Sequence, residues 1–402
     1  MTAWPRWATS DERLMSFSPQ LAAWPGRTLS LFFLVFWSYG CGSGALHRAT
    51  EERHEYPAGV VQMIWRAVIH SYSASEAQPE ECATGALVDS RLILGSRAGQ
   101  VAAVETASGR LVWSVPIAGA IDGEARFDPA RGQVYLGSDD GIFYAIDPHD
   151  GKIRWSYRGK GSVERQPEVG PALVYFVSAA NRVAALEAAT GKRRWQYDRE
   201  TPEGFSIHGH AGPRLGGDVL YTGFDDGYLV ALGAETGELR WARSLAAASD
   251  QFVDVDSTPV LRDDLVIAAS YSGGLYALRA KDGDLVWRMG VEGAIAIRAG
   301  ATRLYVASPR DGLAAMTLQG RIEWRQGLAQ AGDLTPPQEV GPYLVFTGSR
   351  AGLFVVDRSN GHLLQVFDPG RGMCAAPLID PERREIYVLA NSGTLYALSL
   401  IW

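Results

Sequence analysis

A short phrase, glycine followed four residues later by tryptophan, recurs along most of the chain and constrains the fold more than any other feature. The phrase ends at Trp113, Trp155, Trp195, Trp241, Trp287 and Trp324, and residues 360–365 repeat it with glutamine in place of tryptophan. Consecutive tryptophans lie 37 to 46 residues apart, close to the length of a four-stranded propeller blade. The spacing therefore predicts a propeller built from repeated blades.

The sequence between consecutive tryptophans predicts four strands in each repeat. One sequence pattern, two apolar runs separated by Asp-Asp-Gly, occurs both at residues 134–146 and at residues 219–232. Aspartate and glycine tolerate the positive φ of tight hairpin turns, so each pair of runs is a predicted hairpin. A second turn leads into the tryptophan strand. We expect each tryptophan to pack between neighbouring blades, where a large ring buries most area.

Counting the repeats predicts eight blades. Seven units end at the six tryptophans and Gln365, and an eighth begins at Pro377 but lacks its fourth strand. Residues 60–68 have the character of a blade-closing strand and follow no other strands. Pairing this segment with the C-terminal unit closes the ring and leaves only short, protected edges. We predict an all-β, eight-bladed propeller of four-stranded antiparallel blades over residues 59–402.

Composition narrows the possible functions. The chain is 47% hydrophobic and 21% charged, as in ordinary globular proteins, and its net charge is −7. It lacks the basic footprint of a protein that binds nucleic acid. Its longest apolar run, Leu29–Tyr39, has eleven residues, whereas a membrane-spanning helix needs about 20.

This apolar run has the features of an export signal. Arg27 precedes it, and Gly40 and Cys41 follow it, so the segment has a charged end, an apolar stretch and a small-residue cleavage site. It resembles a bacterial lipoprotein signal, with Cys41 as the lipidated new N-terminus. Ser38 and Tyr39 stand where that motif usually has leucine and a small residue. A cleaved but unlipidated signal is the alternative.

The N-terminal boundaries follow from this interpretation. Residues 1–14 contain two acidic residues, unlike the start of a signal, so Met15 is an alternative initiator. We assign residues 1–41 to the signal peptide. Residues 42–58 are glycine-containing and polar, and are predicted to form a flexible tether.

The sequence shows no catalytic or metal-binding constellation. His208 and His210 form a close pair, but no other histidine or cysteine accompanies them at ligand spacing. Residues 159–162 lack the spacing of a phosphate-binding loop. We predict no catalytic residues, no metal and no cofactor.

Two cysteines occupy equivalent places in the repeat. Cys82 and Cys374 each lie three residues before the residue that enters the innermost strand, Gly85 or Pro377. The blades that carry them are neighbours across the ring closure, and an exported protein meets an oxidising compartment. A disulfide that staples the closure is one hypothesis, and two free thiols are the alternative.

Two adjacent connections between blades are longer than the others. From the closing residue of one blade to the first inner-strand residue of the next, five connections span 10 to 13 residues, whereas 195–213 and 241–259 span 18 each. Insertions in repeat proteins map to the binding face. These loops carry apolar and acidic side chains that suit a basic, partly hydrophobic protein surface. The candidate partner-binding residues are Phe205, Ile207, His208, Asp254 and Asp256.

The repeat Gly-x-Leu-Tyr-Ala-Leu-x-x-x-x-Gly-x-x-x-Trp resembles that of the quinoprotein-type propeller family over nearly everything after residue 60. Within that family, the signal, the eight blades, the closing N-terminal strand and the phrase Asp-Val-Asp-Ser-Thr-Pro at 254–259 resemble the BamB family. These are propeller lipoproteins of the outer-membrane β-barrel assembly machinery. The resemblance implies a non-catalytic protein on the periplasmic face of the outer membrane, monomeric within a hetero-complex.

The resemblance also implies roles for the loop residues. In that family two aspartates, with apolar residues and an arginine of the preceding long loop, contact periplasmic domains of the barrel-forming subunit. The aspartates correspond to Asp254 and Asp256. The apolar loop corresponds to Phe205 and Ile207, with His208 in place of the arginine.

Two other functions stay open at this stage. A propeller of this type can bind another periplasmic protein or a polysaccharide. It can also be a quinoprotein dehydrogenase, although those enzymes carry a vicinal cysteine pair, acidic calcium ligands and large insertions, and the cysteines here are isolated.

Overall fold

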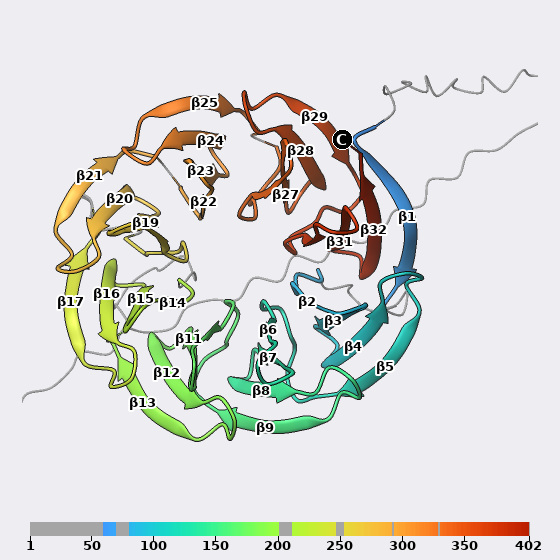
Figure 1. The fold of residues 1–402 in the computed structure, drawn as a ribbon, viewed down its shortest axis with the longest axis horizontal. Helices are drawn as coiled ribbons and strands as arrows, with labels where there is room; N and C mark the ends of the chain where they lie inside the picture. Colours follow the sequence, from blue (N-terminus) through green and yellow to red (C-terminus); the bar gives the residue numbers. More distant parts are fainter. Residues whose placement is uncertain are drawn as a thin grey trace, which may run out of the picture. The chain divides into compact units, whose positions relative to one another are not determined.

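The described part of the chain forms eight four-stranded antiparallel sheets arranged in a ring (Figure 1). The computed structural model describes residues 59–69, 80–200, 211–246, 253–291, 293–328 and 330–401. The predicted signal, its Cys41 and the tether lie outside these residues. The eight-bladed, all-β prediction is confirmed.

The strands of each blade follow one another from the channel to the rim. Blades one to three are β2 (Ala86–Val88), β3 (Arg91–Ser96), β4 (Gln100–Glu105) and β5 (Leu111–Pro116); β6 (Arg126–Asp128), β7 (Gln133–Gly137), β8 (Ile142–Ile146) and β9 (Ile153–Arg158); and β10 (Glu168–Val169), β11 (Leu173–Ser178), β12 (Arg182–Glu187) and β13 (Arg193–Asp198). Blades four and five are β14 (Arg214–Gly216), β15 (Val219–Gly223), β16 (Tyr228–Gly233) and β17 (Leu239–Ser244); and β18 (Val260–Arg262), β19 (Leu265–Ser270), β20 (Gly274–Arg279) and β21 (Leu285–Met289).

The last three blades complete the ring. Blades six and seven are β22 (Ala296–Ala299), β23 (Arg303–Ser308), β24 (Gly312–Thr317) and β25 (Ile322–Gln326); and β26 (Gln338–Val340), β27 (Tyr343–Thr347), β28 (Leu353–Asp357) and β29 (Leu363–Phe367). Blade eight is β30 (Leu378–Asp380), β31 (Glu385–Leu389), β32 (Thr394–Leu400) and β1 (Val61–Val68). β1 pairs antiparallel with β32, from Val61 opposite Leu400 to Val68 opposite Thr394. The predicted closure by the N-terminal strand is confirmed.

The burial of each strand explains its sequence pattern. Second and third strands lie between two neighbouring blades, so both of their faces are buried and they read as continuous apolar runs; all six residues of β11 are buried. Outer strands face solvent on one side, so exposed and half-buried residues alternate, as in β9. The hydrophobic core is thus a series of clusters between adjacent blades, such as the one that joins blades one and two.

Each closing tryptophan fastens its blade to the next one. The indole Nε1 donates a hydrogen bond of 2.8–3.2 Å to a backbone carbonyl in the outer hairpin turn of the following blade. The pairs are Trp65 to Thr106, Trp113 to Pro148, Trp155 to Ala188, Trp195 to Ala234, Trp241 to Ala280 and Trp287 to Leu318. The indole ring also packs against the glycine that lies two or three residues after the acceptor carbonyl in the sequence. We call this unit the tryptophan latch.

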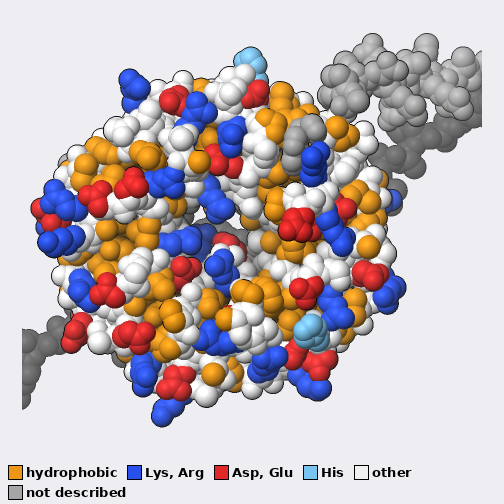
Figure 2. Space-filling view, in the orientation of Figure 1, with side chains coloured by type: hydrophobic (Ala, Val, Ile, Leu, Met, Phe, Trp, Pro, Cys, Tyr) orange, Lys and Arg blue, Asp and Glu red, His pale blue; other side chains and the backbone are white. Residues whose placement is uncertain are grey.

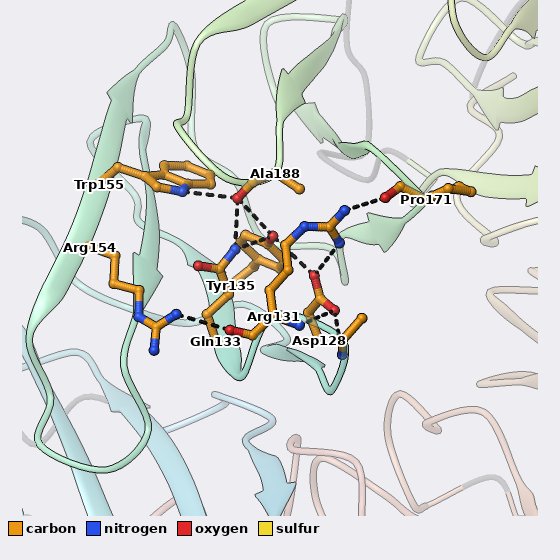
Figure 3. A network of polar contacts seen from close by, with 9 residues as sticks. Asp128, Arg131, Gln133, Tyr135, Arg154, Trp155, Pro171 and Ala188 are labelled. Atoms are coloured by element: carbon orange, nitrogen blue, oxygen red, sulfur yellow. Dashed lines mark hydrogen bonds and ion pairs between the residues drawn. The ribbon is translucent and has the colours of Figure 1, made fainter.

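The latch between blades two and three shows how polar groups reinforce it (Figure 3). The Ala188 carbonyl accepts hydrogen bonds from Trp155 Nε1 at 3.1 Å, Gln133 Nε2 at 2.7 Å and the Tyr135 hydroxyl at 3.2 Å. All three donors belong to blade two and the acceptor belongs to blade three. A carbonyl that accepts several buried donors fixes the angle between the two blades as well as their separation.

The latch between blades six and seven lacks its hydrogen bond. Trp324 Nε1 is buried and has no acceptor among the described residues. The equivalent carbonyl, that of Arg358, accepts from Arg303 Nη1 at 3.1 Å instead. This junction therefore keeps the ring contact of the latch, against Gly361, without its polar component.

Glutamine replaces tryptophan where the ring closes. The next outer strand, β1, comes from the other end of the chain, so no hairpin turn is present to receive a ring. Gln365 Oε1 instead accepts from the Val61 amide at 2.8 Å, and its Nε2 donates to the Val61 carbonyl at 3.0 Å. The amide side chain holds both backbone groups of the closing strand, which explains the one departure from the repeat.

Cys82 and Cys374 form a disulfide at the next junction, between blades eight and one, with their Cα atoms 5.0 Å apart. This distance lies within the range that a disulfide can bridge. Neighbouring backbone groups join the blades as well: the Ala376 amide donates to Thr84 Oγ1 at 2.8 Å. The bond links positions 292 residues apart.

The tryptophan latch requires glycine at the position that the indole ring contacts, and this requirement can be tested. Gly191 has φ +72°, and a Cβ there would lie 2.5 Å from the Trp155 ring, whereas Gly217 has φ +64° and open space around it. Alanine costs about 1 kcal/mol at either position for the positive φ, and overpacking adds about 1–3 kcal/mol only at Gly191. Urea unfolding should show Gly191→Ala less stable than Gly217→Ala by that margin. Equal losses would contradict the latch.

The disulfide can be tested in the same way. Cys82→Ser should lower the free energy of unfolding by about 2–5 kcal/mol, because the bond closes a very long loop. It should also remove the mobility difference between reduced and non-reduced wild-type protein on electrophoresis. Reductant should destabilise the wild type but leave Cys82→Ser unchanged; two free thiols in the native wild type would exclude the bond.

Candidate partner-binding face

The lengthened connections lie on one face of the ring. Because strands alternate in direction, each connection between blades meets the same edge as the turn between the second and third strands of a blade. We call this edge the loop face. The connections 199–213 and 245–259 lead into β14 and β18, so blades four and five are where the loop face is enlarged.

The first connection begins at a firmly held arginine. Residues 201–210 lie outside the described residues, and with them Phe205, Ile207 and His208. Arg199 Nε donates to Asp226 Oδ2 at 2.6 Å, and its guanidinium lies 4.5 Å from the centre of the Tyr228 ring. Burial opposes its charge, but hydrogen bonds to Asp226 and Tyr197 outweigh this and raise the pKa of Arg199. Arg199 thus ties the start of the connection to blade four.

The second connection ends in a segment inserted between two turns. The Val255 amide donates to the Phe224 carbonyl at 3.2 Å, in the turn of blade four. The Tyr271 amide, in the turn of blade five, donates to the Asp254 carbonyl at 3.0 Å. Val255 is fully buried, and a Cβ at Gly223 would lie 2.3 Å from its Cγ1. Glycine at 223 is therefore needed for this close approach.

Both candidate aspartates of the second connection are buried. The exposed fractions of Asp254 and Asp256 are 2% and 4%. They flank Val255, which draws the backbone inward and takes both carboxylates with it. In this conformation neither carboxylate is presented to a partner, and the pair instead shapes the end of the connection.

Burial has an electrostatic consequence. Asp256 Oδ1 is buried without a hydrogen-bond partner among the described residues. Burial, with smaller contributions from Asp254 and Asp225, raises the pKa of Asp256 to about 7, and Arg165 acts in the opposite direction. Asp256 therefore titrates near neutral pH.

Asp256 lies three residues before the first inner-strand residue of its blade. The sequence alone had drawn attention to this position only for the two cysteines. Counting three residues back from the first inner-strand residue gives an acidic residue or cysteine in five of the eight blades, namely Cys82, Asp122, Glu164, Asp256 and Cys374; the other three positions are His210, Ala294 and Leu334. Burial raises the pKa of Asp122 to about 6, so the pKa values of two of these carboxyls are raised by the same cause. Aligning the repeats at this position would have revealed the series.

The comparison with known families decides the classification. A family model described as outer membrane protein assembly factor BamB matches residues 62–162, 97–313 and 273–400, which together span the propeller. The chain belongs to the BamB family. No curated protein sequence matches it.

Solved structures share the fold of this BamB-family chain. BamB from Moraxella catarrhalis has a TM-score of 0.71 and 20% identity, over 85% of this chain and 100% of that one. Quinohemoprotein alcohol dehydrogenase from Comamonas testosteroni has a TM-score of 0.64 and 15% identity, over 85% and 76%. The computationally designed Ika8 protein has a TM-score of 0.67 and 13% identity, over 81% and 98%. At these identities the likeness concerns the fold alone.

In the described ranges, no group of three or more histidine, cysteine, aspartate or glutamate residues is arranged to hold a metal ion. The same residues contain no helix long and apolar enough to span a membrane.

The titration of Asp256 predicts a pH dependence of stability. Its pKa is about 7 in the folded chain and about 3.9 when unfolded, so the folded state holds the proton more tightly. Stability therefore falls as pH rises from about 4 to 7. Between pH 5 and 8 the wild type should lose about 1–3 kcal/mol more than Asp256→Asn in urea unfolding. Parallel pH profiles would show that Asp256 does not titrate in this range.

Proposed function

We propose that this chain is a non-catalytic adaptor of the outer-membrane β-barrel assembly machinery, and that its loop face docks the barrel-forming subunit through that subunit's periplasmic domains. The observation that carries the proposal is the pairing of BamB-family membership with two lengthened connections on adjacent blades. Docking would assist the folding and insertion of outer-membrane proteins. The chain itself would supply binding and orientation.

The geometry of the two connections supports this role. Arg199 and the segment 253–257 fix the ends of the connections to the turns of blades four and five. The middle of the first connection carries Phe205, Ile207 and His208, which we propose make the partner contacts. Anchored ends lower the conformational entropy that ordering a loop costs on binding.

We propose an indirect role in docking for Asp254 and Asp256. Both carboxylates are buried, so they would act by holding the inserted segment in the shape that the partner recognises. Replacing them would then weaken binding through the altered loop, and the effect would exceed that of removing two exposed charges.

The remaining parts of the proposal concern location. The segment 1–41 would direct export, and lipidation of Cys41 would anchor the protein to the periplasmic face of the outer membrane. The tether 42–58 would let the propeller reach its partner. The bond between Cys82 and Cys374 fits an oxidising compartment.

Co-purification from crosslinked outer membranes tests the docking proposal. Wild-type protein should recover the barrel-forming subunit, and Phe205→Ser/Ile207→Ser should recover at least about tenfold less, since burial of such side chains contributes about 1.5–3 kcal/mol each. Asp254→Asn/Asp256→Asn should also reduce recovery.

The control lies on the opposite face of the same blade. Asp282 and Asp284 occupy the outer turn of blade five, with side chains 41% and 55% exposed, so Asp282→Asn/Asp284→Asn removes two charges away from the loop face. Recovery should match the wild type. If folded, correctly localised wild type recovers no barrel-forming subunit, the adaptor role is wrong and screens with polysaccharides and other periplasmic proteins follow. Equal recovery by all variants would place docking elsewhere on the ring.

A further inference from the structure

A second feature of the molecule lies in its central channel. The innermost strands β6, β14 and β22 carry arginine at the same repeat position, one residue after the first inner-strand residue. These are Arg126, Arg214 and Arg298, on blades two, four and six. Figure 2 shows basic side chains gathered around the central opening. Alternate blades thus carry the same cationic residue on their innermost strands.

Electrostatic interactions link Arg214 and Arg298 with each other and with Glu124 of blade two. Glu124 of blade two is influenced by Arg165 of blade three, Arg214 of blade four and Arg298 of blade six. Arg298 in turn is influenced by Arg214, Glu339 and Glu124. Side chains from four blades can interact in this way only if they meet near the axis. We call Arg126, Arg165, Arg214 and Arg298 the channel arginines.

Some of the nearby carboxylates already have cationic partners. Arg214 Nη1 lies 3.7 Å from Glu168 Oε2. Glu339 accepts from the Tyr305 hydroxyl at 2.8 Å and lies 3.6 Å from Arg358 Nη1. Each of these two carboxylates therefore already has a partner of its own, although Glu339 also acts on Arg298.

Two of the channel arginines have N–H groups that can donate hydrogen bonds to an anion. Arg126 Nη1 donates a long bond of 3.5 Å to Gln166 Oε1, and its buried Nε has no acceptor among the described residues. Arg298 is an exposed residue of the innermost strand β22. A buried guanidinium N–H without an acceptor costs about 1–3 kcal/mol, so an acceptor at this place would stabilise the folded chain.

The titration of the neighbouring groups agrees with an electropositive channel. Burial raises the pKa of Glu124, while Arg165, Arg214 and Arg298 act in the opposite direction. Burial and Arg214 lower the pKa of Arg298, as expected where cations crowd together. An anion would relieve this repulsion.

We propose that the channel arginines form a binding site for a small oxyanion, a phosphate or a carboxylate. Guanidinium groups present planar, paired N–H donors that match both anions. Arg126 and Arg298 would bind the anion directly, and Arg165 and Arg214 would supply the surrounding positive potential. This site is independent of docking at the loop face, so either proposal can fail without the other.

Isothermal titration calorimetry with inorganic phosphate tests the site, with ionic strength held constant by chloride. Wild-type protein should bind about one phosphate, and Arg298→Gln and Arg126→Gln should each bind at least about tenfold more weakly, the usual effect of losing a charge-assisted hydrogen bond. A parallel titration with acetate distinguishes the two anions: binding of either supports the site and identifies its preference.

Arg325→Gln is the matched control. Arg325 is exposed on β25, the outer strand of the blade that carries Arg298, so this variant should bind like the wild type. Because Arg298 is exposed, Arg298→Gln should keep the wild-type unfolding midpoint, which separates lost binding from lost folding. Absence of binding to both anions, or equal binding by Arg298→Gln and Arg325→Gln, would overturn the proposal.

Discussion

The contact between each closing tryptophan and the next blade is the interaction on which the rest of the structure depends. A four-stranded blade cannot bury both of its faces alone, and its second and third strands are apolar on both sides. The indole covers the glycine of the neighbouring turn and donates to a carbonyl there. Because the glycine has no Cβ, the ring can approach closely enough to exclude water. Repetition of this contact sets the spacing of the blades, and the spacing determines how many blades close the circle.

Because the latches hold the blades together at the rim of the ring, the connections on the loop face can differ in length. The latches involve only strands and outer turns, so lengthening a connection on the loop face does not disturb them, although the ends of the connections add buried residues such as Val255 to the apolar clusters. The two long connections are nevertheless held at their ends, by Arg199 against Asp226 and by Val255 against Gly223. Where the ring closes, Gln365 and the disulfide hold the blades together, because each joins a residue from the N-terminal part of the propeller to one from its C-terminal part. The result is a rigid support for variable binding segments.

The repeat made the architecture predictable, because each strand and turn reappears in a form that can be checked against the others. The blade number, the closing strand and the place of the tryptophans all followed from it. The environment of Asp254 and Asp256 did not, because whether a loop carboxylate is exposed depends on the apolar residue between them and on Gly223, more than 30 positions away. The channel arginines were also missed. Arg126, Arg214 and Arg298 look like isolated surface charges until the strands that carry them are arranged around one axis.

The central functional claim is that a rigid ring binds its partner through the long connections of one face. Hydrogen–deuterium exchange of the full chain, alone and with the periplasmic domains of the barrel-forming subunit, tests it most directly. The account predicts slowed exchange in peptides covering 199–213 and 245–259, with unchanged exchange in the outer turns on the opposite face, such as 147–152 and 280–284. Protection confined to those outer turns, or to the rim strands, would contradict it.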